Sequence, residues 1–314
     1  PYSLLTISDQ GIVDRSLTNF YAEVKPFKGF TARVQAGFDQ GNSSRSTYLP
    51  RTTLYGALEN GKASINTQKK NDDLLDAILT YNTKIGENNS FTFMAGYSQQ
   101  TFRTETATLG NSNFITDAFL WNNMNAGAGT KVTGSSNSEY SLRSVFSRIN
   151  YSYKDRYMLT STLRRDGSSS NAKNYKYAVF PGIAVGWDVS QESFMSSINN
   201  YVSQLKVRFG YGALGNYGGN ASAAYTAGPA YLNPDESIWA GVFPTRLENP
   251  DLKWETTTEK NLGVDFEILN RRVYGSVEVY DRVVSDLLQE KFINSYNEIN
   301  KVWANIGSTQ SKGV

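Results

Sequence analysis

The sequence predicts an all-β protein, an antiparallel up-and-down β-barrel that spans a membrane. Three observations favour this fold class. Apolar and polar residues alternate with period two over roughly ten segments, several of which are ten residues or longer, whereas strands of soluble proteins average about 5–6. The connections between these segments alternate between short and long. Aromatic residues gather beside the short connections.

The alternating segments form consecutive pairs, each bounded by turn residues. The predicted strands are 19–26 and 30–40, 74–84 and 90–105, 142–153 and 156–166, 177–189 and 205–213, and 258–268 and 272–288, with an eleventh beginning near Trp303. Within most pairs the connection is a tight turn such as Lys154–Asp155. The exception is residues 190–204, a short amphipathic turn between the two strands of the fourth pair.

The connections between pairs are predicted to be mostly long loops, rich in Asn, Ser and Gly. They comprise residues 41–73, 106–141, 167–176, 214–257 and 289–302. In outer-membrane barrels the tight turns lie on one side of the bilayer and the long loops on the other. A soluble β-sandwich has no reason to sort its loops in this way, so the alternation of short and long connections favours a barrel.

The two faces of each predicted strand differ in character. In residues 205–211, Leu205, Val207 and Phe209 lie on one face, and Lys206 and Arg208 lie on the other. Lipid accepts the first set and a water-filled lumen the second, because a charge that faces lipid at mid-depth costs about 2–4 kcal/mol. A soluble antiparallel sheet with one solvated face gives the same alternation, so this pattern alone leaves both possibilities open.

Aromatic side chains cluster at the tight turns, where the amphipathic rings of a membrane barrel form a girdle at headgroup level. The residues concerned are Phe27, Phe30, Phe91, Phe93, Tyr151, Tyr153 and Tyr157. Ordinary core packing is the alternative explanation of these rings.

Composition excludes several classes of function. The chain has 314 residues with no Cys and no His, which removes Cys/His zinc sites, Cys–His nucleophiles and Ser–His–Asp triads. A net charge of +2 provides no strong field for nucleic acid. Mean hydropathy is −0.46, and no apolar run approaches the ~18 residues of a transmembrane helix. We therefore predict no enzyme activity, no catalytic or metal site and no cofactor.

Two motifs suggest small-ligand sites but lack the context that such sites need. Residues 210–215, "GYGALG", match a dinucleotide-binding pattern, yet no apolar-periodic helix follows to hold a pyrophosphate. Residues 166–171, "DGSSSN", resemble part of a calcium loop but lack its glycine and its distal glutamate. The acidic pairs Asp72/Asp73 and Asp235/Glu236 are interpreted as solvated loop residues.

Three aromatic residues in the predicted long loops are candidate substrate-binding residues: Trp121, Tyr231 and Trp239. Exposed aromatic side chains at such positions stack on sugar faces or seal against a partner protein. Local packing that keeps the loops compact is an equally good explanation.

Five blocks of sequence, in this order, resemble the C-terminal half of SusC/RagA-type TonB-dependent transporters, the outer-membrane nutrient importers of Bacteroidetes. They are "RINYSYKDRYMLTSTLRRDGSSS", "FPGIAVGWDVSQESFM", "LKVRFGYGALGN", "NPDLKWETTTEKNLGVDFEILNRRVYGSVEVYDRVVSDLL" and "NIGSTQSKGV". The similarity is dense over residues 144–314 and looser before them. One departure is "DGSSSNAKN", where the family often places an aromatic residue after the serines.

This resemblance implies a partial barrel of a larger plugged TonB-dependent transporter, because plugged transporters have about 22 strands. We expect residues 1–314 to form one barrel segment with no plug domain, no TonB box and no signal peptide. The implied function is TonB-dependent active uptake of oligosaccharides, or of peptides, through the cell outer membrane. The implied partners are a SusD-like surface lipoprotein that lids the barrel, TonB (through the missing N-terminal region) and outer-membrane lipid, with no nucleic acid.

Two other functions remain open at this stage. A passive outer-membrane porin of about 12 strands would transport without energy coupling. A soluble all-β glycan-binding module would show the same alternation and would need no detergent for extraction.

Overall fold

The computed structural model describes residues 5–198, 200–218, 221–222, 224–232, 238–294 and 301–314. Its strands are β1 (Ser8–Val24), β2 (Phe30–Leu49), β3 (Lys62–Ile85), β4 (Asn89–Ser112), β5 (Val132–Tyr153), β6 (Tyr157–Ser168), β7 (Tyr177–Asp188), β8 (Val202–Asn216), β9 (Ala224–Leu232), β10 (Ile238–Arg246), β11 (Glu255–Ile268), β12 (Val273–Ser285), β13 (Leu288–Phe292), β14 (Lys301–Asn305) and β15 (Ser308–Gly313). Its helical elements include the α-helix α1 (Leu54–Leu58) and the 3-10 turns η2 (Met124–Ala126), η3 (Lys173–Tyr175), η4 (Val189–Gln191) and η5 (Ser193–Met195).

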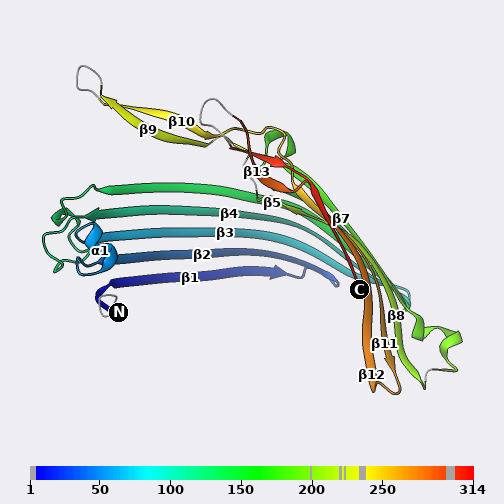
Figure 1. Ribbon diagram of the computed structural model, residues 1–314. Coiled ribbons are helices and arrows are strands. Elements are labelled where there is room, and N and C mark those ends of the chain that lie inside the picture. The colour runs from blue at the N-terminus through cyan, green and yellow to red at the C-terminus, as the bar shows by residue number, and fades with distance from the viewer. Residues whose placement is uncertain (1–4, 199, 219–220, 223, 233–237, 295–300) are drawn as a thin grey trace. The chain divides into compact units, whose positions relative to one another are not determined.

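Eleven strands form one sheet in the order β1-β2-β3-β4-β5-β6-β7-β8-β11-β12-β15 (Figure 1). Consecutive strands are neighbours except where β9–β10 and β13–β14 interrupt the order as separate two-stranded sheets. The pairings from β5 to β8, and from β8 through β11 and β12 to β15, are antiparallel. The predicted all-β class is therefore confirmed. A strand does begin near Trp303 as predicted, but this strand, β14, belongs to a two-stranded sheet, and the eleventh strand of the main sheet is β15.

Two of the predicted long loops are partly strand. β2 continues to Leu49 and β3 begins at Lys62, so only residues 50–61 of the predicted loop 41–73 lie outside strands. β4 continues to Ser112 and β5 begins at Val132, which shortens the predicted loop 106–141 to residues 113–131. β3 and β4 have 24 residues each, whereas about 9–11 are enough to cross a bilayer. The acidic pair Asp72/Asp73 therefore lies in β3 and not in a loop.

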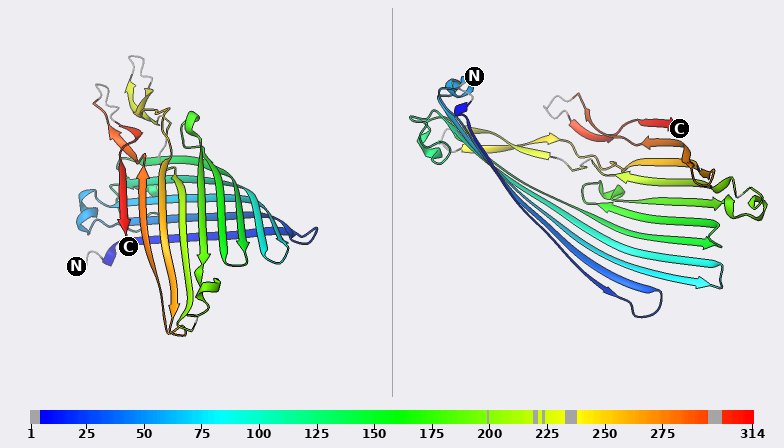
Figure 2. Two further views of the ribbon diagram at one scale, coloured as in Figure 1. Left: turned by 90° about the vertical axis from the view of Figure 1, so that its right-hand side faces the viewer. Right: turned by 90° about the horizontal axis from the view of Figure 1, so that it is seen from below.

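The chain divides into two compact units. The first comprises Pro1–Ala22, Val34–Asp76 and Gln99–Ser141, and the second comprises Glu23–Arg33, Ala77–Ser98 and Leu142–Val314. In the second unit, β6, β7, β8, β11 and β12 lie side by side as a continuous ribbon of strands (Figure 2). The strands β1 to β5 contribute residues to both units.

The first unit has a small hydrophobic core where its loops meet the ends of its strands. Tyr48, Ala63 and Phe114 are fully buried there, and the rings of Tyr48 and Phe114 pack edge to face with centroids 5.6 Å apart. Thr53 caps α1 by accepting a hydrogen bond from the backbone N–H of Gly56. This core orders residues 113–131 against β2 and β3.

The second unit has a comparable core among its own loops. Ala172, Ala221 and Leu252 are buried, and Trp303 of β14 packs against them. Asn305 ties these segments together, because its amide group donates to the backbone carbonyls of Lys253 and Asp286. The loops of this unit are thus compact structures that lie beside a sheet with an exposed apolar face.

Candidate functional site

The sheet of the second unit carries a band of exposed apolar side chains on one face. Cross-strand partners place Val185 beside Phe209, Phe209 beside Leu262 and Leu262 beside Val279. The next row toward the tight turns joins Val207, Val264 and Val277. Leu262 and Val279 leave 51% and 52% of their surfaces exposed. A contiguous apolar patch of this extent on a folded protein indicates contact with lipid or with another protein.

Aromatic rings border this band at the tight turns. The rings of Tyr153 and Tyr157 stack with centroids 6.2 Å apart, and Trp187 continues the stack at 6.5 Å from Tyr157. A second group comprises Phe91, which stacks on Tyr151 at 4.6 Å. Such a row of Tyr, Trp and Phe at the edge of an apolar band is typical of the interfacial girdle of a membrane barrel.

Glu192 holds part of this girdle in position. Its carboxylate accepts hydrogen bonds from the Tyr157 hydroxyl at 2.5 Å and from the Trp187 indole N–H at 3.0 Å, and it pairs with Arg156 at 2.7 Å. The polar edges of two girdle rings are therefore satisfied by one carboxylate in the connection after β7. This residue was not identified from the sequence, since its partners come from two different strands.

The opposite face of the same strands carries charged side chains that bind one another. Arg208 of β8 donates two hydrogen bonds to Asp265 of β11, at 2.9 and 3.0 Å, and also pairs with Glu278 of β12. Asn261 donates to the other oxygen of Glu278 at 3.3 Å. Paired bonds between a guanidinium and a carboxylate are strong and directional. In the rows from Leu262 to Val264 one face is thus apolar and the other is ionic, which confirms the alternation predicted for residues 205–211. The apolar band ends at the next row away from the tight turns, where Lys260 faces Asp281.

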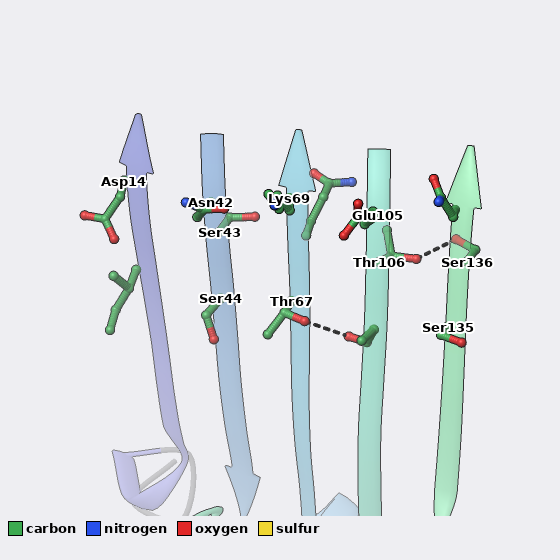
Figure 3. A pocket seen from close by; sticks show the side chains of 14 residues that line it. Asp14, Asn42, Ser43, Ser44, Thr67, Lys69, Glu105, Thr106, Ser135 and Ser136 are labelled. Atoms are coloured by element: carbon green, nitrogen blue, oxygen red, sulfur yellow. Dashed lines mark hydrogen bonds between the residues drawn. The ribbon is translucent and has the colours of Figure 1, made fainter. Parts of the chain in front are cut away.

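The first unit contains a shallow groove of about 800 Å³ that runs across β1 to β5 (Figure 3). It is lined by Ile12, Asp14, Asn42, Ser43, Ser44, Thr67, Gln68, Lys69, Glu105, Thr106, Ala107, Ser135, Ser136 and Asn137. Thr67 and Lys69 share a face of β3 with Asp73 and Leu75, because residues two apart in a strand point to the same side. Gln68, which also lines the groove, lies on the opposite face of β3.

The three aromatic residues predicted to bind substrate lie in two different places. Trp121 is half-buried against the core of Tyr48 and Phe114, so local packing accounts for its position. Tyr231 and Trp239 are cross-strand partners in the β9–β10 hairpin, although the sequence placed both in a loop. The backbone register therefore places Tyr231 and Trp239 at opposite positions of one hairpin, and Trp121 lies in a separate cluster. Their role in binding remains a prediction.

The remaining sequence motifs have structural explanations. Residues 210–215 lie within β8, with no helix after them in the described residues. Asp166 accepts a hydrogen bond from Arg164 at 2.6 Å. Asp235 and Glu236 fall outside the described residues. In the part of the chain that the structure describes, no cluster of three or more acidic side chains is arranged to hold a metal ion. No described helix has the length and apolar character needed to cross a membrane.

One polar cluster in the first unit shows perturbed acidity. Asp117 accepts hydrogen bonds from the Tyr48 hydroxyl at 2.8 Å and from Arg51, whose Nε lies 3.2 Å away. Burial and the bond to Asp117 raise the pKa of Tyr48 to about 12. Burial alone would raise the pKa of Asp117, but the bonds from Tyr48 and Arg51 outweigh it and lower that pKa below its ordinary value. Tyr48 and Arg51 lie at the end of β2 and just after it, and Asp117 lies in the connection between β4 and β5.

Comparison with known proteins gives consistent matches over this fold. Residues 6–314 match the model of the TonB dependent receptor-like β-barrel family. TonB-dependent receptor P3 of Formosa agariphila is 34% identical over 100% of this chain and 31% of its own length. TonB-dependent receptor SusC of Bacteroides thetaiotaomicron is 35% identical over 55% of this chain and 18% of its own length.

A solved structure shares the fold. The RagAB peptide transporter superposes with a TM-score of 0.87 at 23% identity, over 100% of this chain and 34% of that chain. The chain thus spans about a third of the length of the full-length relatives that it matches. The resemblance to SusC/RagA-type proteins predicted from five blocks of sequence is confirmed.

Proposed function

Because the chain belongs to the TonB dependent receptor-like β-barrel family, we propose that it forms part of the wall of an importer that takes up oligosaccharides, or peptides, by TonB-dependent active transport. The protein is an outer-membrane β-barrel protein of the SusC/RagA type, in a family of transporters and not of enzymes. We propose the substrate class, the energy source and the partner of this receptor.

The contrast between the two faces of one sheet carries this proposal. The face with Phe209, Leu262 and Val279 suits lipid, whereas the face with Arg208 and Asp265 suits a polar lumen. A soluble glycan-binding module would have to leave the apolar band in water or cover it with another layer. The described residues contain no layer of helices or strands over that face.

The edges of the sheet support the idea that this barrel has further strands. In the described sheet, β1 pairs only with β2, and β15 pairs only with β12. A backbone edge that faces lipid leaves unsatisfied N–H and C=O groups, each of which costs several kcal/mol. We propose that other strands of the receptor pair with β1 and β15, in agreement with relatives about three times as long as this chain.

The proposed partners are those expected of a SusC/RagA-type importer. A plug domain would fill the lumen and would transmit force from TonB. A SusD-like surface lipoprotein would cover the barrel and deliver the ligand. The hairpin β9–β10, with Tyr231 and Trp239 as cross-strand neighbours, is the part of this chain that we assign to contact with ligand or lid.

Measurements on the native receptor test this proposal. The receptor is extracted from outer membranes with detergent, and its intact mass is determined together with that of any protein that co-purifies. A mass several times the 34.9 kDa of this chain, with a lipoprotein attached, is the expected result. A receptor of 34.9 kDa without a partner would favour the passive porin, and release into buffer without detergent would favour the soluble module.

A growth experiment tests energy coupling and substrate class. A strain that lacks the receptor gene is complemented with the intact gene and supplied with either oligosaccharides or peptides as the sole carbon source. We expect growth on one of these classes only when TonB is functional. Growth that persists after TonB is inactivated would contradict active transport and would support diffusion through a porin.

A further inference from the structure

The apolar face of β5 to β7 ends in two arginine residues. Along β5 the outward side chain above Val145 is Arg143, and along β6 the outward side chain above Leu163 is Arg165. Leu163 and Val145 are exposed apolar residues of the lipid-facing band. The transition from aliphatic to guanidinium side chains therefore falls at one edge of that band on two adjacent strands.

Register brings the two arginines close together. Arg143 is the cross-strand partner of Gly167, and Arg165 is the partner of Val145, so the arginines occupy diagonal positions on the same face. Diagonal neighbours in an antiparallel pair lie about 7–8 Å apart, within reach of two long side chains that share one anion. Tyr177 of β7 completes the group, because the guanidinium of Arg165 lies 4.5 Å from the centroid of its ring.

The height of this group above the aromatic girdle matches the thickness of a membrane. Tyr177 and Trp187 are the first and eleventh residues of β7, and Trp187 belongs to the girdle at the tight turns. Ten residues of strand span about 33 Å, and a tilt of roughly 40° reduces this to about 25 Å in height. The apolar band of an outer-membrane barrel is about 25 Å tall. Since tight turns lie on the periplasmic side, the arginines face the outer leaflet at headgroup level.

The outward positions of β5 from Arg143 to Tyr153, and those of β6 and β7, carry no Asp or Glu among the described residues. Further along the same face of β5, Glu139 is paired with Arg103 at 2.7 Å. The neighbouring Asp166 points to the other face, where it binds Arg164. Exposed Lys173 and Lys176, in the connection from β6 to β7, add further positive charge nearby.

We propose that Arg143, Arg165 and Tyr177 form a binding site for the phosphate group of a phosphorylated outer-leaflet glycolipid. Guanidinium groups donate paired hydrogen bonds to phosphate oxygens, and the ring of Tyr177 orients one of them. The acyl chains of the same lipid lie along the apolar band, which begins at Val145 and Val179 beside Arg165 and continues at Leu163. The site fixes the depth of the barrel on its outer side, and the girdle fixes it on the inner side.

Lipid binding to the purified native receptor tests this site. Phosphorylated lipid A is titrated into the detergent-solubilised receptor, and bound lipid is counted by native mass spectrometry. Each basic side chain near an anionic surface changes affinity about fivefold, so Arg143→Gln with Arg165→Gln should weaken binding about 25-fold. The matched control is Lys28→Gln with Lys154→Gln, which removes two cations at the tight turns, where Lys154 lies 5.4 Å from the ring of Tyr153. The control should bind as the unaltered receptor does.

Two further measurements distinguish the source of the phosphate and guard against misfolding. Dephosphorylated lipid A should bind about as weakly to the unaltered receptor as the intact lipid binds to the arginine variant. Inorganic phosphate at the same concentration should not displace the lipid, and displacement would reassign the site to free phosphate. Arg165→Lys, which keeps the charge but loses the paired hydrogen bonds and the stacking on Tyr177, should bind more weakly than the unaltered receptor and more tightly than Arg165→Gln. Equal lipid affinity of the unaltered receptor and the double arginine variant would overturn the proposal.

Discussion

Asp117 organises the loop core of the first unit because two side chains from the end of β2 and its connection converge on its carboxylate. The Tyr48 hydroxyl donates to it, and Arg51 pairs with it at 3.2 Å. Tyr48 is fully buried, so its hydroxyl depends on this single partner for satisfaction. The same contact lowers the pKa of Asp117 and raises that of Tyr48, which makes the core sensitive to pH at both extremes.

We predict that the loop of residues 113–131 is held most tightly between about pH 4 and pH 10. The contribution of Asp117 is full above its ordinary pKa of 3.8 and is lost as pH falls through its lowered pKa. The contribution of Tyr48 is full below its ordinary pKa of 10.0 and is lost as pH rises toward about 12. Rates of limited proteolysis in this loop, measured across pH, check both limits. Tyr48→Phe should remove the extra alkaline sensitivity, and an identical alkaline response of the two proteins would contradict the prediction.

The sequence predicts which residues lie on the luminal face but not which residues they pair with. Alternation within residues 205–211 is enough to place Arg208 opposite Phe209. The ion pairs to Asp265 and Glu278 depend on the register of β8 with β11 and of β11 with β12. Residues 57 and 70 positions away in sequence become neighbours only through that register. For the same reason, Glu192 and the pair Arg143 and Arg165 could not be recognised before the strands were aligned.

At the scale of single elements, glycine residues in strands allow aromatic rings to lie flat against the sheet. A Cβ atom at Gly215 of β8 would overlap the ring of Phe180, and one at Gly96 of β4 would overlap the ring of Phe146. Phe180 is buried and packs edge to face against Trp254, with centroids 5.6 Å apart. The motif at residues 210–215 thus has one glycine with a packing role, whereas Gly210 and Gly212 face open space. Covering of a glycine by a neighbouring aromatic ring is a known stabiliser of sheets.

We predict that Gly215→Ala destabilises the receptor by about 1–3 kcal/mol, because the added methyl group displaces the ring of Phe180 from its packing against Trp254. Gly212→Ala, three residues earlier in the same strand, is the matched control, since nothing lies within 4 Å of its added carbon. Heat-induced loss of the compact form on gels gives the measurement. Equal transition temperatures for the two variants would contradict this role for Gly215.

Strands were predicted well where one of their faces meets lipid, and poorly elsewhere. β6, β7 and β12 carry aliphatic residues at alternate positions, and their predicted bounds lie close to those observed. Beyond Gln40, β2 reads "GNSSRSTYL", which is polar on both faces and gives no hydrophobic period. The hairpin β9–β10 was missed because it contains Pro229 and Pro244, which argue against a strand. Apolar and polar residues alternate only where a strand has lipid on one face and water on the other. A strand with water on both faces does not show this pattern.

At the scale of the whole molecule, one face of the sheet is in contact with lipid and the other with a polar lumen. Val277 and Ser276 are neighbours in β12 and are both exposed, yet they point to opposite faces. Val277 is paired with Val264 in the apolar band, whereas Ser276 is paired with Asp265 on the ionic face. Total exposure is therefore no guide to how a substitution is tolerated.

We predict that Val277→Arg destabilises the folded receptor by about 2–4 kcal/mol and that Ser276→Arg costs less than about 1 kcal/mol. The first places a cation in lipid near the middle of the band, and the second places it beside Asp265 in a polar lumen. Urea titration of the receptor in lipid vesicles measures both variants against the unaltered protein. If the two substitutions were equally costly, this face of the sheet would not be in contact with lipid.

The order of strands in the sheet has a consequence for how the protein acquires its fold. Most neighbours in the sheet are neighbours in the chain, and backbone bonds at the turns join successive hairpins, from Lys154 N–H to Asn88 carbonyl at 2.7 Å and from Asp188 N–H to Arg156 carbonyl at 2.8 Å. Each hairpin can therefore be added to the preceding one by closing a short loop, which costs little chain entropy. The junctions of β8 with β11 and of β12 with β15 are different, because β9–β10 and β13–β14 lie between these strands, and the first junction has the longer intervening segment, residues 217–254 against 286–307. Pairing of β8 with β11 is thus the slow step expected in the assembly of this sheet, and it divides the chain into two kinetic modules.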